Sequence, residues 1–357
     1  MTPVGVSDLP GLHGVENLIS SVTEAGNETT RMMLQKILPG GKRLRPVMVL
    51  LAASFYPHDE KEAEYTAAAT ELIHAASLVH DDVIDLAATR RGDSSVNKAW
   101  GNHAAVLLGD YLFAEAFRLL ANCRSPIVKA MTRTIQVMCE GEIDQLTQSR
   151  NPATTEEQYF SRIGKKTASL IAASCQLGGL VAGLDEGKLE ALREYGLEVG
   201  LAFQIVDDLL DFVSTEAAVG KPVGHDIANG TLTLPLLHLL KQSRQPLKLW
   251  QDLTKDEEEG GKLMLELMSR SGSLEYSWVQ AVEKIDKACG CLDRMPAGRS
   301  QEMLRDLAFQ VLARPELKKF GLPEKAAEEV QPLGLHPPIP HDFVNNGDES
   351  LLLHLGV

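Results

Sequence analysis

The stretch Leu78-Val79-His80-Asp81-Asp82-Val83-Ile84-Asp85 places three acidic residues inside a segment that is otherwise apolar. On an α-helix, Asp81 and Asp85 are four residues apart and therefore lie on the same face. The stretch Ile205-Val206-Asp207-Asp208-Leu209-Leu210-Asp211 repeats the D-D-x-x-D pattern. Because carboxylates are rarely buried without a neutralising partner, two such pairs on apolar helices need cations. We expect Mg²⁺, which prefers oxygen ligands from a few carboxylates, waters and a substrate phosphate.

The apolar residues around both motifs have helical spacing. Residues 63–84 and 188–213 are long segments rich in Ala or Leu, and no segment shows a convincing period-2 alternation. An aromatic content of 5% also suits an aliphatic helical protein. The sequence therefore predicts an all-α protein, a bundle of roughly ten or more helices in one domain over residues 1–314. Residues 86–102 are expected to form a loop, and residues 252–261 an acidic surface connection.

Residues 315–357 have a different character from the rest of the chain. Six prolines interrupt them, and Asn345-Asn346-Gly347-Asp348 is typical of a turn or linker. We expect a Pro-rich tail. Two interpretations are open: the tail is loosely ordered, or the apolar Leu351-Leu352-Leu353 docks on the bundle or on a partner subunit.

Charge and composition exclude several classes of protein. A net charge of −14 argues against nucleic acid as a partner, because phosphate binding needs a basic face. The five cysteines form no C-x-x-C pair, so free thiols in a reducing compartment are expected. The first residues do not form a signal peptide, and no apolar stretch reaches the ~20 residues of a membrane span. We expect a cytoplasmic protein.

Four clusters of cations accompany the acids. They contain Lys42 to Arg45, Arg90-Arg91, Lys165-Lys166 and Lys221. They are too dispersed for a P-loop, and each could be a solvated surface group or pair with an acid of the bundle. In a chain of net charge −14, four such clusters favour diphosphate groups as ligands, since Arg suits bidentate phosphate contacts.

Several motifs in this order resemble the all-trans isoprenyl diphosphate synthase family, from about residue 39 to 240. The motifs are Gly40-Gly41-Lys42-Arg43-Leu44-Arg45-Pro46, the two D-D-x-x-D stretches, Arg90-Arg91-Gly92, Gly109-Asp110-Tyr111-Leu112, Gly141-Glu142, Lys166-Thr167, Phe203-Gln204 and Gly220-Lys221-Pro222 with Asp226. The resemblance implies an all-α fold with a deep central cavity, usually in a homodimer. The substrates would be isopentenyl diphosphate and an allylic diphosphate.

The resemblance also implies a role for individual residues. Mg²⁺, about three ions per site, would be bound by Asp81, Asp85 and Asp207, with Asp82, Asp208 and Asp211 in support. Isopentenyl diphosphate would contact Lys42, Arg45, His74 and Arg91. The allylic diphosphate would contact Arg90, Lys166, Thr167, Gln204 and Lys221. One departure is Thr231, which stands where many members carry a second lysine after the Gly-Lys-Pro loop, so a cation over the leaving diphosphate would be lost.

The implied reaction is electrostatic. Cations stabilise the departing diphosphate, an allylic carbocation forms, the double bond of isopentenyl diphosphate attacks it, and loss of a proton completes a trans double bond. No side-chain nucleophile is needed. A terpene cyclase is disfavoured by the second D-D-x-x-D and by the Gly-Gly-Lys motif. A non-catalytic subunit of a heteromeric synthase is less expected, because all six acids are present.

Product length depends on the residues that precede the first motif. Ser77 and Ala76 lie four and five residues before Asp81, about one helical turn below it, and both are small. Ile73 is a moderate obstacle one turn further. The resemblance implies that a Phe or Tyr at these positions would stop the chain at about C15, and its absence leads us to hypothesise a medium- or long-chain product of about C30 to C50. Geranylgeranyl diphosphate is the alternative product. Transient membrane contact is expected when such an apolar product leaves.

Overall fold

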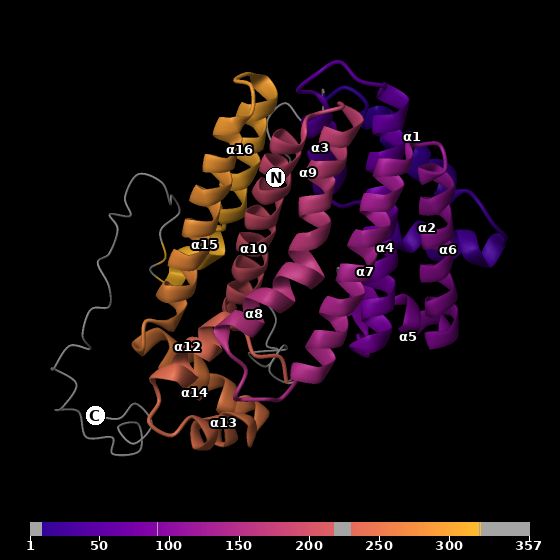
Figure 1. Cartoon of the computed structure of the whole chain (residues 1–357). Helices are drawn as coiled ribbons and strands as arrows, with labels where there is room; N and C mark the ends of the chain where they lie inside the picture. Colours follow the sequence, from indigo (N-terminus) through magenta and orange to yellow (C-terminus); the bar gives the residue numbers. More distant parts are fainter. Residues whose placement is uncertain (1–8, 91, 218–229, 321, 323–357) are drawn as a thin grey trace. The chain divides into compact units, whose positions relative to one another are not determined.

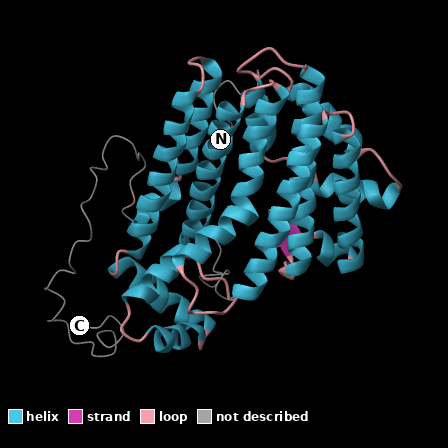
Figure 2. Cartoon of the chain, in the orientation of Figure 1, coloured by secondary structure: helices cyan, strands magenta, loops and turns pink. Residues whose placement is uncertain are grey.

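The computed structural model describes residues 9–90, 92–217, 230–320 and 322. Apart from one two-stranded ladder, its regular structure is helical (Figure 2), which confirms the all-α prediction. The α-helices are α1 (Leu12–Thr23), α2 (Glu28–Ile37), α3 (Leu44–Ala53), α4 (Glu60–Ile84), α5 (Val96–Trp100), α6 (Asn102–Leu120), α7 (Ser125–Gln148), α8 (Glu156–Ile163), α9 (Ser169–Val181), α10 (Glu186–Ala217), α12 (Leu234–Gln242), α13 (Pro246–Thr254), α14 (Glu257–Arg270), α15 (Ser273–Cys291) and α16 (Arg299–Leu312). Within these described ranges, no helix combines the length and hydrophobicity that a membrane crossing requires.

The chain divides into two compact units, each built from separate segments. Unit 1 comprises residues 1–138, 169–197 and 288–307, and unit 2 comprises residues 139–168, 198–287 and 308–357. Helices α7, α10, α15 and α16 each begin in one unit and end in the other. The first acid motif belongs to unit 1 and the second to unit 2. The prediction of a single helical domain stays a prediction.

The core of unit 1 is built around α4, which packs against α6, α3, α1 and α9 (Figure 1). Its N-cap is Asp59, whose carboxylate accepts hydrogen bonds from the backbone N–H groups of Lys61 and Glu62. Small residues allow close packing elsewhere in this unit. A Cβ on Gly178 of α9 would lie 2.2 Å from the carbonyl oxygen of Val49 on α3, so only glycine permits this approach.

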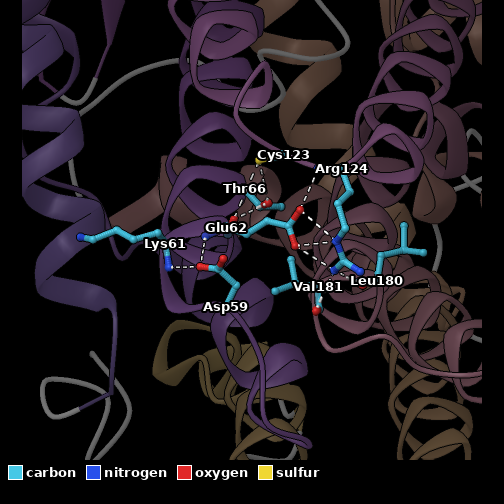
Figure 3. Close-up of polar contacts among 8 residues, drawn as sticks. All are labelled: Asp59, Lys61, Glu62, Thr66, Cys123, Arg124, Leu180 and Val181. Carbon is cyan, nitrogen blue, oxygen red and sulfur yellow. Dashed lines mark hydrogen bonds and ion pairs between the residues drawn. The ribbon is translucent and has the colours of Figure 1, made fainter.

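A polar clamp fastens the N-terminal end of α4 (Figure 3). The carboxylate of Glu62 accepts hydrogen bonds from Arg124 Nε, at 3.1 and 2.9 Å, and from the Arg124 backbone N–H at 2.7 Å. The same guanidinium donates to the carbonyl oxygens of Leu180 and Val181, at the C-terminal end of α9. The Glu62 side chain is only 8% exposed, so the clamp joins a buried acid to three segments of unit 1.

Two sequence-based expectations for connecting segments were wrong in part. Residues 86–102 contain an antiparallel ladder of β1 (Thr89–Arg90) and β2 (Asp93–Ser94), followed by α5. The acidic segment 252–261 is mostly helical, because α13 ends and α14 begins within it. The predicted tail begins with a short 3-10 helix, Pro315–Phe320. Its apolar end, Leu351 to Leu353, lies outside the described residues.

Candidate active site

The first acid motif occupies the C-terminal end of α4, with Asp85 as the C-cap residue. Asp81 is half-buried, Asp82 is buried and Asp85 is exposed. Acids are unfavourable at this end of a helix, where the macrodipole is negative, and the last turn of α4 contains no basic residue. The motif therefore costs stability unless cations from outside the helix compensate it.

Arg90 supplies one such cation to the middle acid. From β1, its Nε donates to both oxygens of Asp82 at 2.8 Å, and one terminal nitrogen donates to Oδ1 at 2.6 Å. Asn97 donates from its side-chain amide to the Asp82 carbonyl oxygen at 3.0 Å. Arg90 was predicted to contact the allylic diphosphate; in this structure it neutralises Asp82. Its contact with a diphosphate stays a prediction.

The second acid motif lies on α10, in the part that belongs to unit 2. Asp208 is buried, and its two oxygens accept hydrogen bonds from Tyr159 Oη at 2.7 Å and Gln204 Nε2 at 2.8 Å. Burial, followed by the neighbouring Asp211, raises the pKa of Asp207, while Arg314 opposes the shift. The Asp207 side chain reaches solvent, but the protein around its carboxylate still removes part of its hydration. Asp207 and Asp211 therefore repel each other, as a pair of cation ligands does when no cation is bound.

Lys166 and Thr167 lie in a π-helical segment, Gly164–Ala168, between α8 and α9. The Thr167 hydroxyl donates to Gln204 Oε1 at 2.7 Å, and Lys166 forms an ion pair with Glu142 at 2.6 Å. Gly141 permits this packing, because a Cβ there would lie 2.5 Å from the Lys166 backbone nitrogen. The structure thus brings Lys166, Thr167 and Gln204 together with the second motif, and π-helical segments are frequent at functional sites.

The residues predicted for isopentenyl diphosphate lie in unit 1. Lys42 is exposed, and His74 is half-buried on α4, two turns before Asp81 and on the same face. Burial is the largest influence on the guanidinium of Arg45 and lowers its pKa, which Glu71 opposes. Its buried Nε has no hydrogen-bond partner among the described residues. An unsatisfied buried donor is costly, so Arg45 is suited to an anionic ligand.

The sequence analysis placed Arg43 in a cation cluster suited to diphosphate groups, but in the structure its guanidinium is paired within the protein and fixes the segment that leads into α3. Arg43 has a left-handed backbone (φ 48°), and its guanidinium donates to Glu16 at 2.8 Å, Glu71 at 3.1 Å and the Leu38 carbonyl at 2.9 Å. Tyr159 and Glu142 were missed as site residues. Tyr159 resembles an ordinary core aromatic in sequence, and Glu142 is marked only by its place in the Gly141-Glu142 motif.

Some predicted residues are not placed. Arg91 and Lys221 lie outside the described residues, whereas Thr231 is half-buried. Ala76 and Ile73 are fully buried, but Ser77 is half-buried, with its hydroxyl donating to the His74 carbonyl oxygen at 2.9 Å. Among the described residues, no group of three or more His, Cys, Asp or Glu side chains is gathered closely enough to hold a metal ion.

Comparison with known proteins identifies the family of these motifs. The sequence model of the family described as polyprenyl synthetase matches residues 27–268. The chain is 40% identical over 279 residues to heptaprenyl diphosphate synthase component 2 of Geobacillus stearothermophilus, covering 78% of this chain and 87% of that one. It is 38% identical over 280 residues to octaprenyl diphosphate synthase of Escherichia coli (77% and 86%). It resembles the crystal structure of a Caulobacter crescentus polyprenyl synthase complexed with calcium and isoprenyl diphosphate, with a TM-score of 0.79, 36% identity and coverages of 85% and 94%.

Proposed function

The chain belongs to the polyprenyl synthetase family, and from this premise we propose how its residues carry out prenyl transfer. It is a prenyltransferase that condenses isopentenyl diphosphate with an allylic diphosphate. The observation that carries the proposal is the shared design of the two acid motifs. In each, a buried middle aspartate is held by protein donors, while the outer two acids lie four residues apart on one helical face.

The outer acids fit a divalent metal. Carboxylate oxygens are the ligands that Mg²⁺ prefers, and the raised pKa of Asp207, caused first by burial and then by Asp211, supports a bound cation there. We assign about three Mg²⁺ ions to the two motifs taken together, bound by Asp81 and Asp85 in the first motif and by Asp207 in the second, with substrate oxygens and waters as the remaining ligands. When bound, Mg²⁺ would neutralise the negative charge that develops on the leaving diphosphate.

The residues of the chain have separate tasks in this proposal. The allylic diphosphate is oriented by Lys166, Thr167 and Gln204. When the bond to its allylic carbon breaks, these residues balance the negative charge of the departing diphosphate. Arg45 and Lys42 hold the diphosphate of isopentenyl diphosphate, whose double bond then attacks the allylic cation. The released diphosphate is the base that removes the proton. No protein nucleophile takes part.

The product is a medium- or long-chain all-trans polyprenyl diphosphate of about C30 to C50, because Ser77 and Ala76, one turn below Asp81, have side chains too small to stop a growing chain. The names of the heptaprenyl and octaprenyl relatives support this range. Geranylgeranyl diphosphate is the second candidate product.

Product analysis tests the function directly. The full-length protein, incubated with Mg²⁺, farnesyl diphosphate and isopentenyl diphosphate, should release diphosphate and give products longer than C20 on chromatography. Asp81→Asn and Asp207→Asn should each abolish release, whereas Arg305→Ala, a change in an exposed ion pair, should leave it intact. Products that stop at C20 would overturn the chain-length proposal in favour of geranylgeranyl diphosphate. No release, either from the pure protein or after addition of a partner subunit, would overturn its catalytic role.

We propose a homodimer formed through one face of α6. Val106, Leu107, Asp110, Ala114 and Phe117 are exposed at helical spacing, and Leu107 and Phe117 are 67% and 41% exposed. Such a stripe, apolar except for Asp110, suits a second copy of the chain, related by a two-fold axis. The relative named component 2 raises the alternative of a different partner subunit.

Light scattering after size exclusion distinguishes these states. The wild type should elute as a dimer, and Leu107→Lys should shift it to the monomer. Leu247→Lys on α13, at a side chain 63% exposed, is the matched control and should remain dimeric. A monomeric wild type that becomes active only with a second protein would favour the heteromeric alternative.

A further inference from the structure

We propose that Tyr159 is a positioning residue for the second acid motif and the allylic diphosphate site, an inference that rests on the proposed function. Tyr159 lies on α8, 49 residues before Asp208, and it is neither a cation nor one of the carboxylates that Mg²⁺ prefers. Its hydroxyl nevertheless makes a 2.7 Å hydrogen bond to a buried carboxylate of that motif.

Tyr159 begins a continuous chain of hydrogen bonds. Its hydroxyl donates to Asp208 Oδ2, Gln204 Nε2 donates to Asp208 Oδ1 at 2.8 Å, and Thr167 Oγ1 donates to Gln204 Oε1 at 2.7 Å. This series of hydrogen bonds joins α8, α10 and the π-helical segment. Since the amide of Gln204 has its oxygen toward Thr167 and its nitrogen toward Asp208, the orientation of the amide depends on Asp208 being held in place.

Tyr159 is itself rigidly held. Its side chain is fully buried, the Phe160 ring contacts it edge-on at 5.3 Å between centroids, and the Arg162 guanidinium lies 5.6 Å from its ring centroid. Arg162 is fixed in turn by a 2.7 Å hydrogen bond to the Leu232 carbonyl oxygen. The start of α8 is fixed by a capping box between Thr155 and Gln158. The hydroxyl therefore has a defined position before any ligand binds.

The position of Asp208 controls its neighbours on α10. Asp207 and Asp211 share one face of the helix, and Asp208 is rotated by about 100° from Asp207. With both oxygens of Asp208 engaged by protein donors, this aspartate anchors α10 and sets the rotation at which Asp207 and Asp211 are presented. Loss of the Tyr159 hydroxyl should therefore weaken binding of Mg²⁺ and diphosphate at this motif. The isopentenyl diphosphate residues of unit 1 should be unaffected.

Tyr159→Phe removes only the hydroxyl, and Tyr195→Phe is its matched control. Tyr195 is also fully buried, and its hydroxyl donates to the backbone carbonyl oxygen of Leu304 at 2.6 Å, with no acid involved. Calorimetric titration of inorganic diphosphate in saturating Mg²⁺ measures binding without turnover. We expect Tyr159→Phe to raise the dissociation constant about tenfold, the effect of losing one hydrogen bond to a charged group. Tyr195→Phe should lower the melting temperature and leave the dissociation constant unchanged.

Steady-state kinetics provides the second readout. Tyr159→Phe should raise the Mg²⁺ concentration at half-maximal activity and the KM of the allylic substrate, with less than a twofold change in the KM of isopentenyl diphosphate. If Tyr159→Phe does not fold, Thr155→Ala removes the capping box that fixes the start of α8 and should give the same selective loss in weaker form.

Three outcomes would overturn the proposal. The first is a Tyr159→Phe protein that binds Mg²⁺ and diphosphate as the wild type does. The second is an equal rise in both KM values. The third is an equal effect of Tyr159→Phe in wild-type and Asp208→Asn backgrounds, since the hydroxyl would then not act through Asp208. An inactive wild type would instead refute the proposed function, so the two failures are distinguishable.

Discussion

Replacing Arg90 by alanine should separate its structural role from its predicted role in substrate binding. Arg90 makes three hydrogen bonds of 2.6 to 2.8 Å to Asp82, whose side chain is 4% exposed. Removing one partner of a buried ion pair costs about 3–5 kcal/mol. The Arg90 side chain is 35% exposed, so water will partly replace it, and we expect a loss of about 2 kcal/mol. For a chain of this size, that corresponds to a fall of about 4 °C in melting temperature.

Thermal unfolding without metal or substrate, followed by circular dichroism, measures this loss. In an Asp82→Asn background the same Arg90→Ala change should cost less than about 1 kcal/mol, because the charge that Arg90 neutralises is gone. Arg305→Ala is the control, since its ion pair with Asp293 is exposed and should contribute less than about 0.5 kcal/mol. Equal losses in both backgrounds, or a loss no larger than that of the control, would refute this account of Arg90.

Three other predictions follow from single side chains. Ser77→Phe and Ala76→Phe should both shorten the product on chromatography. Ala76→Phe should also lower the free energy of unfolding by about 1–3 kcal/mol, because Ala76 is fully enclosed. Unchanged products would show that the growing prenyl chain takes another route. The raised pKa of Asp207 means that the folded state binds its proton more tightly than the unfolded chain, so stability falls as pH rises through that pKa. Asp207→Asn should therefore melt at a higher temperature than the wild type at pH 7 without metal, and the difference should close below about pH 4; equal melting at pH 7 would contradict it. Arg124→Ala should destabilise by about 2–3 kcal/mol in chemical denaturation, by leaving the buried Glu62 without its guanidinium, and a changed KM would argue against a purely structural clamp.

The sequence predicted the helical fold because long elements repeat their signal many times. Helix α4 presents apolar residues over seven turns. The predicted start of this helix was therefore correct to within three residues, and its predicted end is the observed end. The ladder at residues 89–94 has two residues in each strand, too few for any alternation. The π-helical segment adds one residue to a turn, a change too small to alter the apolar spacing of its neighbours.

The partners of the middle aspartates could not be predicted. Asp82 and Asp208 each follow another aspartate directly, and the sequence does not indicate which acid of each pair is the one held by protein donors. Their difference arises from tertiary contacts: Arg90 reaches Asp82 from a hairpin, and Tyr159 reaches Asp208 from another helix. An apolar helical pattern around an aromatic residue such as Tyr159 predicts burial but not the direction of its hydroxyl.

The two motifs solve one physical problem by different means. Like charges four residues apart tend to relieve their repulsion by moving, and moving would spoil the geometry that a metal ion needs. A buried middle acid that is hydrogen-bonded on both oxygens resists this movement, because its donors fix the helix at that residue. At the end of α4, where the macrodipole is unfavourable, the donor is a cation, Arg90; inside α10, the neutral donors Tyr159 and Gln204 serve. It follows that changes at the middle acids or their donors should weaken binding by altering geometry, whereas changes at the outer acids should remove the charge that binds the metal.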